Sequence, residues 1–110
     1  MGRLTTHVLD TAAGRPAAGV ALALCRIAPG GRVALATAVT NADGRTDEPL
    51  LAGPAFEGGL YELSFSVGAY FDDGGFYDVV PVRFRITDAG AHYHVPLLIS
   101  PFGYSTYRGS

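Results

Sequence analysis

Residues 61–67 read Tyr-Glu-Leu-Ser-Phe-Ser-Val, and residues 80–86 read Val-Pro-Val-Arg-Phe-Arg-Ile. In both stretches a large apolar side chain stands at every second position. A period of two is typical of a β-strand that packs one face on a core and turns the other outward. The same period continues through the rest of the chain, in residues 20–26 and 92–99 and, as further candidates, 5–9, 33–39 and 103–107.

Turn residues separate these stretches. The chain holds 15 glycines and 7 prolines, which is enough to supply a tight turn between each pair of short strands. The turn signals lie at residues 13–16, 29–31, 41–44, 57–59, 73–75 and 88–90. Regular short strands with glycine-rich turns predict an all-β sandwich or barrel. Residues 69–73 leave room for one short helix.

The size and composition of the chain exclude several classes of protein. A chain of 110 residues, 48% of them hydrophobic and 16% charged, predicts one folded domain over residues 1–110 and is too apolar for disorder. A formal net charge of −2 argues against a nucleic-acid partner held by phosphate attraction. Apolar stretches fall short of the about 20 residues of a membrane span. The single cysteine excludes an intrachain disulfide, so we expect a soluble cytoplasmic domain.

One face of the strand at residues 92–99 is unusual. The face opposite the core-facing residues carries His92, His94, Pro96 and Leu98. This face is more apolar than a solvent-facing side of a strand normally is. Such a face is typical of a subunit contact or a binding groove, and the alternative is a partly exposed strand with incidental histidines. Pro96 lacks a backbone donor, which predicts an edge strand or a local bulge.

The isolated polar residues do not compose a catalytic motif by spacing alone. His92 and His94 project from one strand face, but no third ligand is fixed near them, so the sequence does not predict a metal site. Cys25 lies among core-pattern residues and is interpreted as a small buried hydrophobe. The paired glycines are interpreted as hairpin turns and not as a phosphate-binding loop. No cofactor is predicted.

Two segments carry a family resemblance. His7-Val8-Leu9-Asp10 followed by Gly14-Arg15-Pro16-Ala17 resembles the N-terminal signature of the transthyretin-like proteins. Residues 92–110 resemble the family more specifically. The closing Tyr107-Arg108-Gly109-Ser110 is similar to the hallmark of the branch that hydrolyses 5-hydroxyisourate, the product of urate oxidation.

The resemblance implies a fold, an assembly and a site. The fold is a transthyretin-like sandwich of two antiparallel four-stranded sheets with one short helix. The assembly is a homotetramer, a dimer of dimers, with active sites in a channel where the dimers meet. The implied catalytic residues are His7, Arg45, His94 and Ser110. The implied substrate-binding residues are His7, Arg45, Tyr107, Leu9, Pro96, Leu98, Ser105 and Arg108.

The resemblance also implies roles for these groups. His7 and His94 jointly activate water, since a neutral imidazole suits that task and the sequence does not separate the two. Arg45 offers a charged fork to carbonyl oxygens, and Tyr107 orients the ring of the substrate. Arg108 and the carboxylate of Ser110 fix the tail. The alternatives are a transthyretin-like protein that binds a small ligand without turnover, and a β-sandwich interaction domain without a site.

Overall fold

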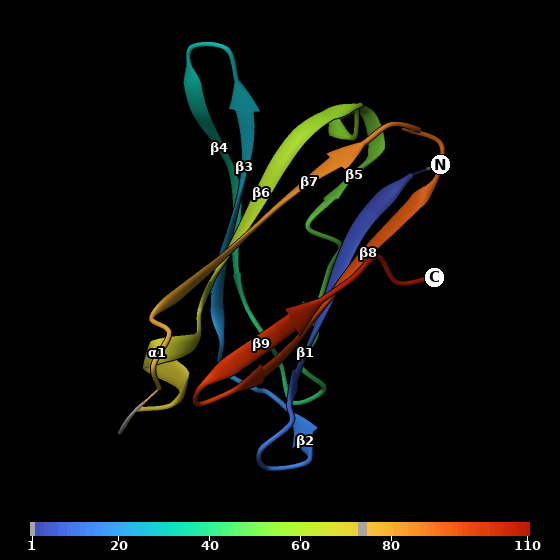
Figure 1. Cartoon of the computed structure of the whole chain (residues 1–110). Helices are drawn as coiled ribbons and strands as arrows, with labels where there is room; N and C mark the ends of the chain where they lie inside the picture. Colours follow the sequence, from blue (N-terminus) through green and yellow to red (C-terminus); the bar gives the residue numbers. More distant parts are fainter. Residues whose placement is uncertain (1, 73–74) are drawn as a thin grey trace.

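The computed structural model describes residues 2–72 and 75–110 and folds them into two β-sheets packed face to face (Figure 1). The strands of these residues are β1 (Arg3–Asp10), β2 (Arg15–Pro16), β3 (Ala21–Ala28), β4 (Gly31–Val39), β5 (Leu51–Ala52), β6 (Gly59–Ser66), β7 (Val79–Ile86), β8 (His92–Ser100) and β9 (Gly103–Thr106). Two short helical turns complete the elements, η1 (Gly53–Ala55) and α1 (Val67–Tyr70). The seven strands expected from the period of two are confirmed to within a few residues.

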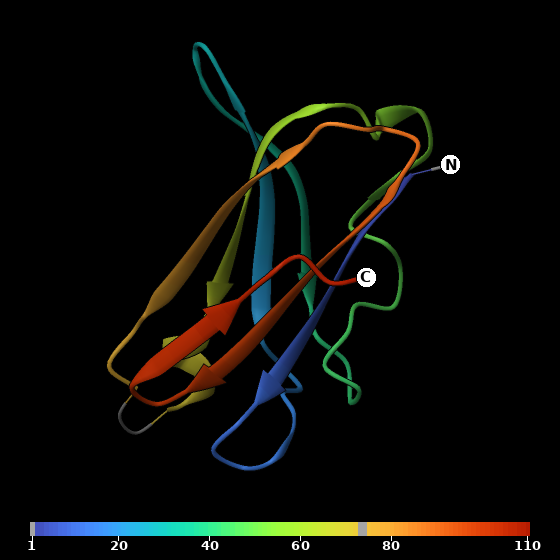
Figure 2. The ribbon, with the colours of Figure 1, turned by 45° about the vertical axis from the view of Figure 1, so that its right-hand side comes forward.

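The two sheets differ in the number and the direction of their strands. One has the order β4-β3-β6-β7 and is antiparallel throughout. The other has the order β2-β1-β8-β9, with β5 paired to β1. Figures 1 and 2 show β1 and β8 side by side in the same direction, and their register is parallel from Arg3 opposite His92 to Asp10 opposite Ile99. The predicted all-β sandwich of two sheets is therefore confirmed, but this sheet is mixed and five-stranded instead of antiparallel and four-stranded.

The strand β8 lies inside its sheet, between β1 and β9, so it is not the edge strand that Pro96 suggested. The Pro96 carbonyl accepts a hydrogen bond from Thr106 Oγ1 at 2.7 Å, so the backbone polar groups of Pro96 face β9. β9 ends at Thr106, and the next backbone bond joins Gly109 N–H to the His94 carbonyl at 2.8 Å. The donorless nitrogen of Pro96 thus lies where the ladder is interrupted, and no bond is lost there.

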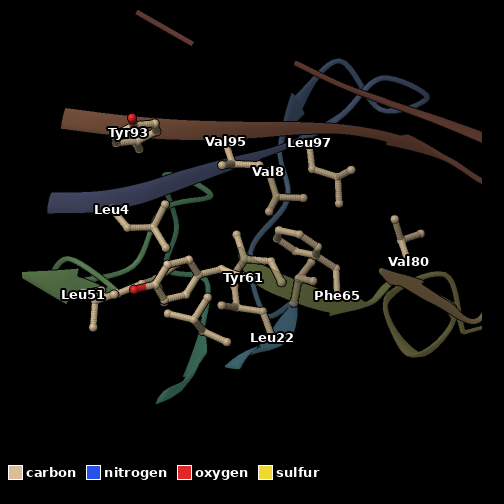
Figure 3. Close-up of a cluster of buried hydrophobic side chains, with 14 of the residues drawn as sticks. Leu4, Val8, Leu22, Leu51, Tyr61, Phe65, Val80, Tyr93, Val95 and Leu97 are labelled. Atoms are coloured by element: carbon tan, nitrogen blue, oxygen red, sulfur yellow. The ribbon is translucent and has the colours of Figure 1, made fainter. Parts of the chain in front are cut away.

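The core lies between the two sheets. Side chains of β1 and β8 meet those of β6, β3 and β7 across the layer (Figure 3). Tyr61, Leu63 and Phe65 are fully buried, as the alternation of residues 61–67 predicts. Figure 3 shows this layer with Leu4, Val8, Leu22, Leu51, Tyr61, Phe65, Val80, Tyr93, Val95 and Leu97 labelled. Burial of these apolar side chains is the main favourable contribution to folding.

The opposite face of the antiparallel sheet carries an ionic cluster that includes the cysteine. Glu62 is buried there and pairs with Arg32 and, at 3.0 Å, with Arg83. Cys25 lies opposite Glu62 in the register and accepts a hydrogen bond from Arg32 at 3.6 Å. The prediction of a buried core cysteine is wrong, because the period of two that buries Leu24 turns Cys25 to the other face.

The predicted helix is present but begins earlier than expected. α1 covers Val67–Tyr70, so Val67 starts the helix and does not end the strand. Its Tyr70 hydroxyl donates to Asp10 Oδ2 at 2.7 Å and ties α1 to the end of β1. Residues 73 and 74, which belong to a predicted turn, lie outside the described residues. Neither helical segment of the described chain has the length or hydropathy of a membrane span.

Candidate active site

Arg45 is placed by a compact turn that packs against β1. The Asn41 side-chain carbonyl accepts the N–H groups of Asp43 (2.9 Å) and Arg45 (3.2 Å), and Asn41 N–H bonds to the Arg45 carbonyl at 2.8 Å. Gly44 has φ of +74° and lies so close to the Val8 carbonyl that a Cβ would collide with it. Since only glycine fits this approach, the turn is held on β1 and the Arg45 side chain is presented beside the sheet.

His92 and His94 extend from β8 toward the same hydroxyl group on β1. Thr5 Oγ1 lies 2.9 Å from His92 Nε2 and 2.8 Å from His94 Nδ1. The parallel register places Thr5 opposite His94, which accounts for the contact. The expectation that both histidines share one strand face is confirmed.

The C-terminal segment packs on His94 from the other side. Gly109 N–H bonds to the His94 carbonyl at 2.8 Å. A Cβ added at Gly109 would lie 2.5 Å from His94 Cδ2 and 3.2 Å from Pro96 Cγ. The imidazole of His94 is therefore confined between the Thr5 hydroxyl and the backbone of the tail.

These groups border one open pocket of about 370 Å³. Its lining consists of Arg3, Thr5, Thr6, Arg45, Thr46, Asp47, Glu48, Pro49, His92, His94 and Ser110. Burial lowers the pKa of His94 from its ordinary value. Electrostatic repulsion from Arg45, and from His92 and His7, lowers that pKa further. A neutral imidazole and a guanidinium thus share a pocket at neutral pH, which suits water activation beside a developing negative charge.

The structure brings together some of the predicted site residues and not others. Arg45, His94 and Ser110 line the pocket, and His7 lies half-buried on β1 opposite Pro96, close enough to influence the pKa of His94. The outer face continues along the strands away from these histidines, with Leu9 opposite Leu98 and Leu98 opposite Ser105. Pro96, on this face, is buried.

Tyr107 and Arg108 lie elsewhere in the single chain. They line a smaller hollow of about 210 Å³ with Val82, Phe84 and other residues at the edge of the sandwich. The Arg108 guanidinium lies 4.3 Å from the centre of the Tyr93 ring, a cation–π contact. The Arg108 side chain is thus held against Tyr93. Within a single chain, Tyr107 does not line the pocket of His94.

The pocket contains groups that sequence reasoning did not select. Thr5, Arg3, Asp47 and Glu48 line it, as does His92, which the sequence places on the unusual face of residues 92–99 but not among the site residues. The period of two places Thr5 on the face of His7, which is the one signal that could have indicated it. Within residues 2–72 and 75–110, no three side chains of His, Cys, Asp or Glu are grouped closely enough to hold a metal ion.

Comparison with known proteins gives one consistent result. The model of the HIUase/Transthyretin family matches residues 4–109. A 5-hydroxyisourate hydrolase of Ralstonia nicotianae is 56% identical over all of both chains. The solved structure of Klebsiella pneumoniae 5-hydroxyisourate hydrolase has a TM-score of 0.85 at 40% identity, with full coverage of both chains. Sea bream transthyretin in complex with thyroxine has a TM-score of 0.91 at 32% identity, over 97% of this chain and 94% of that one. The chain belongs to the HIUase/Transthyretin family.

Proposed function

We propose that the chain hydrolyses 5-hydroxyisourate to 2-oxo-4-hydroxy-4-carboxy-5-ureidoimidazoline, a step of urate breakdown. The observation that carries the proposal is the pairing of a half-buried histidine of lowered pKa, His94, with the guanidinium of Arg45 at one pocket. The identity of 56% to a protein named for this hydrolysis supports the same substrate.

The reaction adds water across a cyclic amide. A neutral imidazole of His94 or His7 removes a proton from water, and the oxygen attacks the C6 carbonyl of the six-membered ring. Arg45 stabilises the negative charge that develops on that carbonyl oxygen. The N1–C6 bond then breaks, and the proton taken from water is returned to N1. The reaction requires neither a metal nor an organic cofactor.

The remaining predicted residues are assigned to substrate binding and to the assembly. Ser110 lines the pocket, which supports its assignment to the catalytic set. Leu9, Pro96, Leu98 and Ser105 extend the same sheet face and are proposed as channel walls in a homotetramer. Tyr107, a residue that is 58% exposed, is proposed to contact substrate in that assembly, with Arg108 fixing the tail. The unpaired Cys25 agrees with the reducing cytoplasm that we infer as the location.

The test is a decay assay. 5-Hydroxyisourate is generated in place with urate oxidase, and its disappearance is followed in the ultraviolet with and without the protein. We expect acceleration by the wild type and losses of about 10²- to 10⁴-fold for His7→Ala, Arg45→Ala and His94→Ala. Arg85→Ala is the matched control, because Arg85 is exposed on β7 and lies outside the pocket lining. An unaccelerated decay would reject the proposal.

A second function is supported by the apolar outer face and by the transthyretin found in complex with thyroxine. In that case the channel binds a small aromatic ligand and performs no chemistry. Tight binding of such a ligand together with no turnover in the decay assay would favour it.

A further inference from the structure

The hydroxyl of Thr5 is shared by two imidazoles. Thr5 Oγ1 lies 2.9 Å from His92 Nε2 and 2.8 Å from His94 Nδ1, both within hydrogen-bond distance. A threonine hydroxyl carries one proton and two acceptor lone pairs. These two nitrogens are its only hydrogen-bond partners among the described residues, so within the protein it donates to one of them and accepts from the other. The protonation of the two facing nitrogens is therefore linked, and two arrangements satisfy both bonds while the hydroxyl proton is donated within the protein.

In the first arrangement, His94 carries its proton on Nδ1 and donates it to Thr5. Thr5 then donates to His92 Nε2, which must hold a lone pair. In the second arrangement His92 Nε2–H donates to Thr5, and Thr5 donates to the lone pair of His94 Nδ1. A neutral His94 then carries its proton on Nε2, so the first arrangement alone leaves Nε2 of His94 unprotonated.

The charge of each ring bears on which of the two arrangements forms. If His92 is an imidazolium, its Nε2–H donates to Thr5, and His94 Nδ1 is then the one acceptor among the described residues for the hydroxyl proton. This gives the second arrangement, in which a neutral His94 has no free lone pair on Nε2. If His94 is an imidazolium, its Nδ1–H donates to Thr5, and a hydroxyl proton kept within the protein is then donated to a neutral His92. If both rings were charged, Thr5 would accept from both nitrogens, and its own proton would have no acceptor among the described residues.

We propose that Thr5 is a positioning residue that couples the tautomers of His92 and His94, so that His94 presents an unprotonated Nε2 only while His92 is neutral. The inference deepens the function proposed above, since it rests on His94 acting on water. Nε2 of His94 has no hydrogen-bond partner among the side chains of the described residues, as a nitrogen that acts on water requires.

Other charges face the same rings. Arg45 approaches from the 41–45 turn, His7 and Arg3 from β1, and Asp47 and Glu48 from the segment that follows Arg45. Ser110, from the C-terminal segment, lines the same pocket. These groups shift the pH at which a ring becomes charged, but they do not change how many protons the Thr5 hydroxyl can share.

The experiment compares Thr5→Val, which removes the hydroxyl at nearly constant shape, with Thr5→Ser, which keeps it. Thr11→Val is the control, because Thr11 Oγ1 bonds to the Ile99 carbonyl at 3.0 Å and the variant removes the same atom away from the histidines. The tautomers are read from the nitrogen-15 shifts of the three histidine rings in the full-length protein. The pH profile of kcat/KM for 5-hydroxyisourate hydrolysis is measured on the same samples.

We expect His94 to be the Nδ1–H tautomer above pH 8 in the wild type and in Thr5→Ser. Thr5→Val should mix the tautomers of both rings and lower kcat/KM by about tenfold or more, since a wrong tautomer removes the base. His92→Gln keeps a group that can hydrogen-bond to Thr5, but glutamine does not titrate. In this variant the fall of kcat/KM at low pH should depend on one proton fewer than in the wild type.

A wild-type His94 that carries its proton on Nε2 above pH 8 would overturn the proposal without any variant. Unchanged tautomers and an unchanged pH profile in Thr5→Val would do the same. If the wild type shows coupled tautomers and no hydrolysis, the coupling stands and the proposed function fails, because the nitrogen-15 measurement does not depend on turnover.

Discussion

Gly109 is the residue at which one added methyl group has the clearest expected effect. A Cβ there would lie 2.5 Å from His94 Cδ2, closer than side chains approach one another. We expect Gly109→Ala to displace the His94 ring or the tail and to lower kcat by about tenfold or more, with little change in stability because the segment is at the surface. Gly30→Ala is the control, since nothing lies within 4 Å of a Cβ there. Full activity of Gly109→Ala would show that this contact does not position His94.

The pKa of His94 gives the second prediction at this scale. Burial, and then the charge of Arg45, hold this pKa below the ordinary value of about 6.5 for histidine. The unfolded chain therefore binds a proton more readily than the folded chain, so the free energy of unfolding falls as the pH drops through 6.5 and levels off below the folded pKa. An NMR titration of His94 measures this pKa, and Arg45→Gln should raise it whereas Arg85→Gln should not. A pKa above 6.5 in the wild type would contradict this account.

At the scale of elements, Asp10 joins β1 to its following turn and to α1. Its carboxylate is buried and accepts the N–H groups of Ala12 (3.0 Å) and Ala13 (2.9 Å) and the hydroxyl of Tyr70 (2.7 Å). Burial opposes the charge, but these hydrogen bonds outweigh it and lower the pKa of Asp10. The stabilisation is therefore present above about pH 3.9 and is lost as the pH falls through the lower folded pKa.

We expect Asp10→Asn to lower the free energy of unfolding by about 1–3 kcal/mol at pH 7 in urea, because an amide supplies one acceptor where the carboxylate supplies two. The loss should shrink at pH 3. Asp88→Asn is the control, since Asp88 makes an exposed local bond to Gly90 N–H at 2.9 Å and should change stability by about 0.5 kcal/mol or less. Equal losses for both variants would contradict the role given to Asp10.

The tail is fixed to the sandwich by Arg108. Its guanidinium lies over the ring of Tyr93. The Tyr93 hydroxyl accepts the N–H groups of Thr87 and Asp88 at 3.0 Å each, which fixes the position of the ring. Arg108→Ala should cost only about 0.5–1 kcal/mol of stability but should lower activity several-fold by loosening the tail. Tyr93→Phe keeps the ring and loses the hydroxyl, so it should cost stability with a smaller loss of activity. If Arg108→Ala retains full activity, the contact is not what holds the tail in place.

At the scale of the whole molecule, the sheet face that carries the pocket also carries half-buried Leu9 and Leu98. We expect light scattering to give four times the chain mass of 11.5 kDa, because a face of this kind is stabilised by burial against another copy. Leu98→Glu should lower both the mass and the activity. Val33→Glu, on β4 and already 48% exposed, should change neither. A monomeric and fully active wild type would exclude a shared channel.

The sequence by itself determined the strands, because alternation and turn residues are local. The period of two located Tyr61, Leu63 and Phe65 in the core, and it placed His92 and His94 on one face. The resemblance named Arg45 and His94 as site residues, and both line the pocket. Contacts between distant segments were not accessible in this way, since spacing does not say which strands are neighbours.

Only the tertiary structure decided what β8 lies against. The parallel pairing with β1 joins residues 87 and 89 positions apart, and it alone brings the Thr5 hydroxyl to His92 and His94. It also made β8 an interior strand despite Pro96, because the tail leaves the ladder where that residue has nothing to donate. Local patterns fix which side chains point inward, whereas the position of a shared proton depends on which strands meet across the sheet.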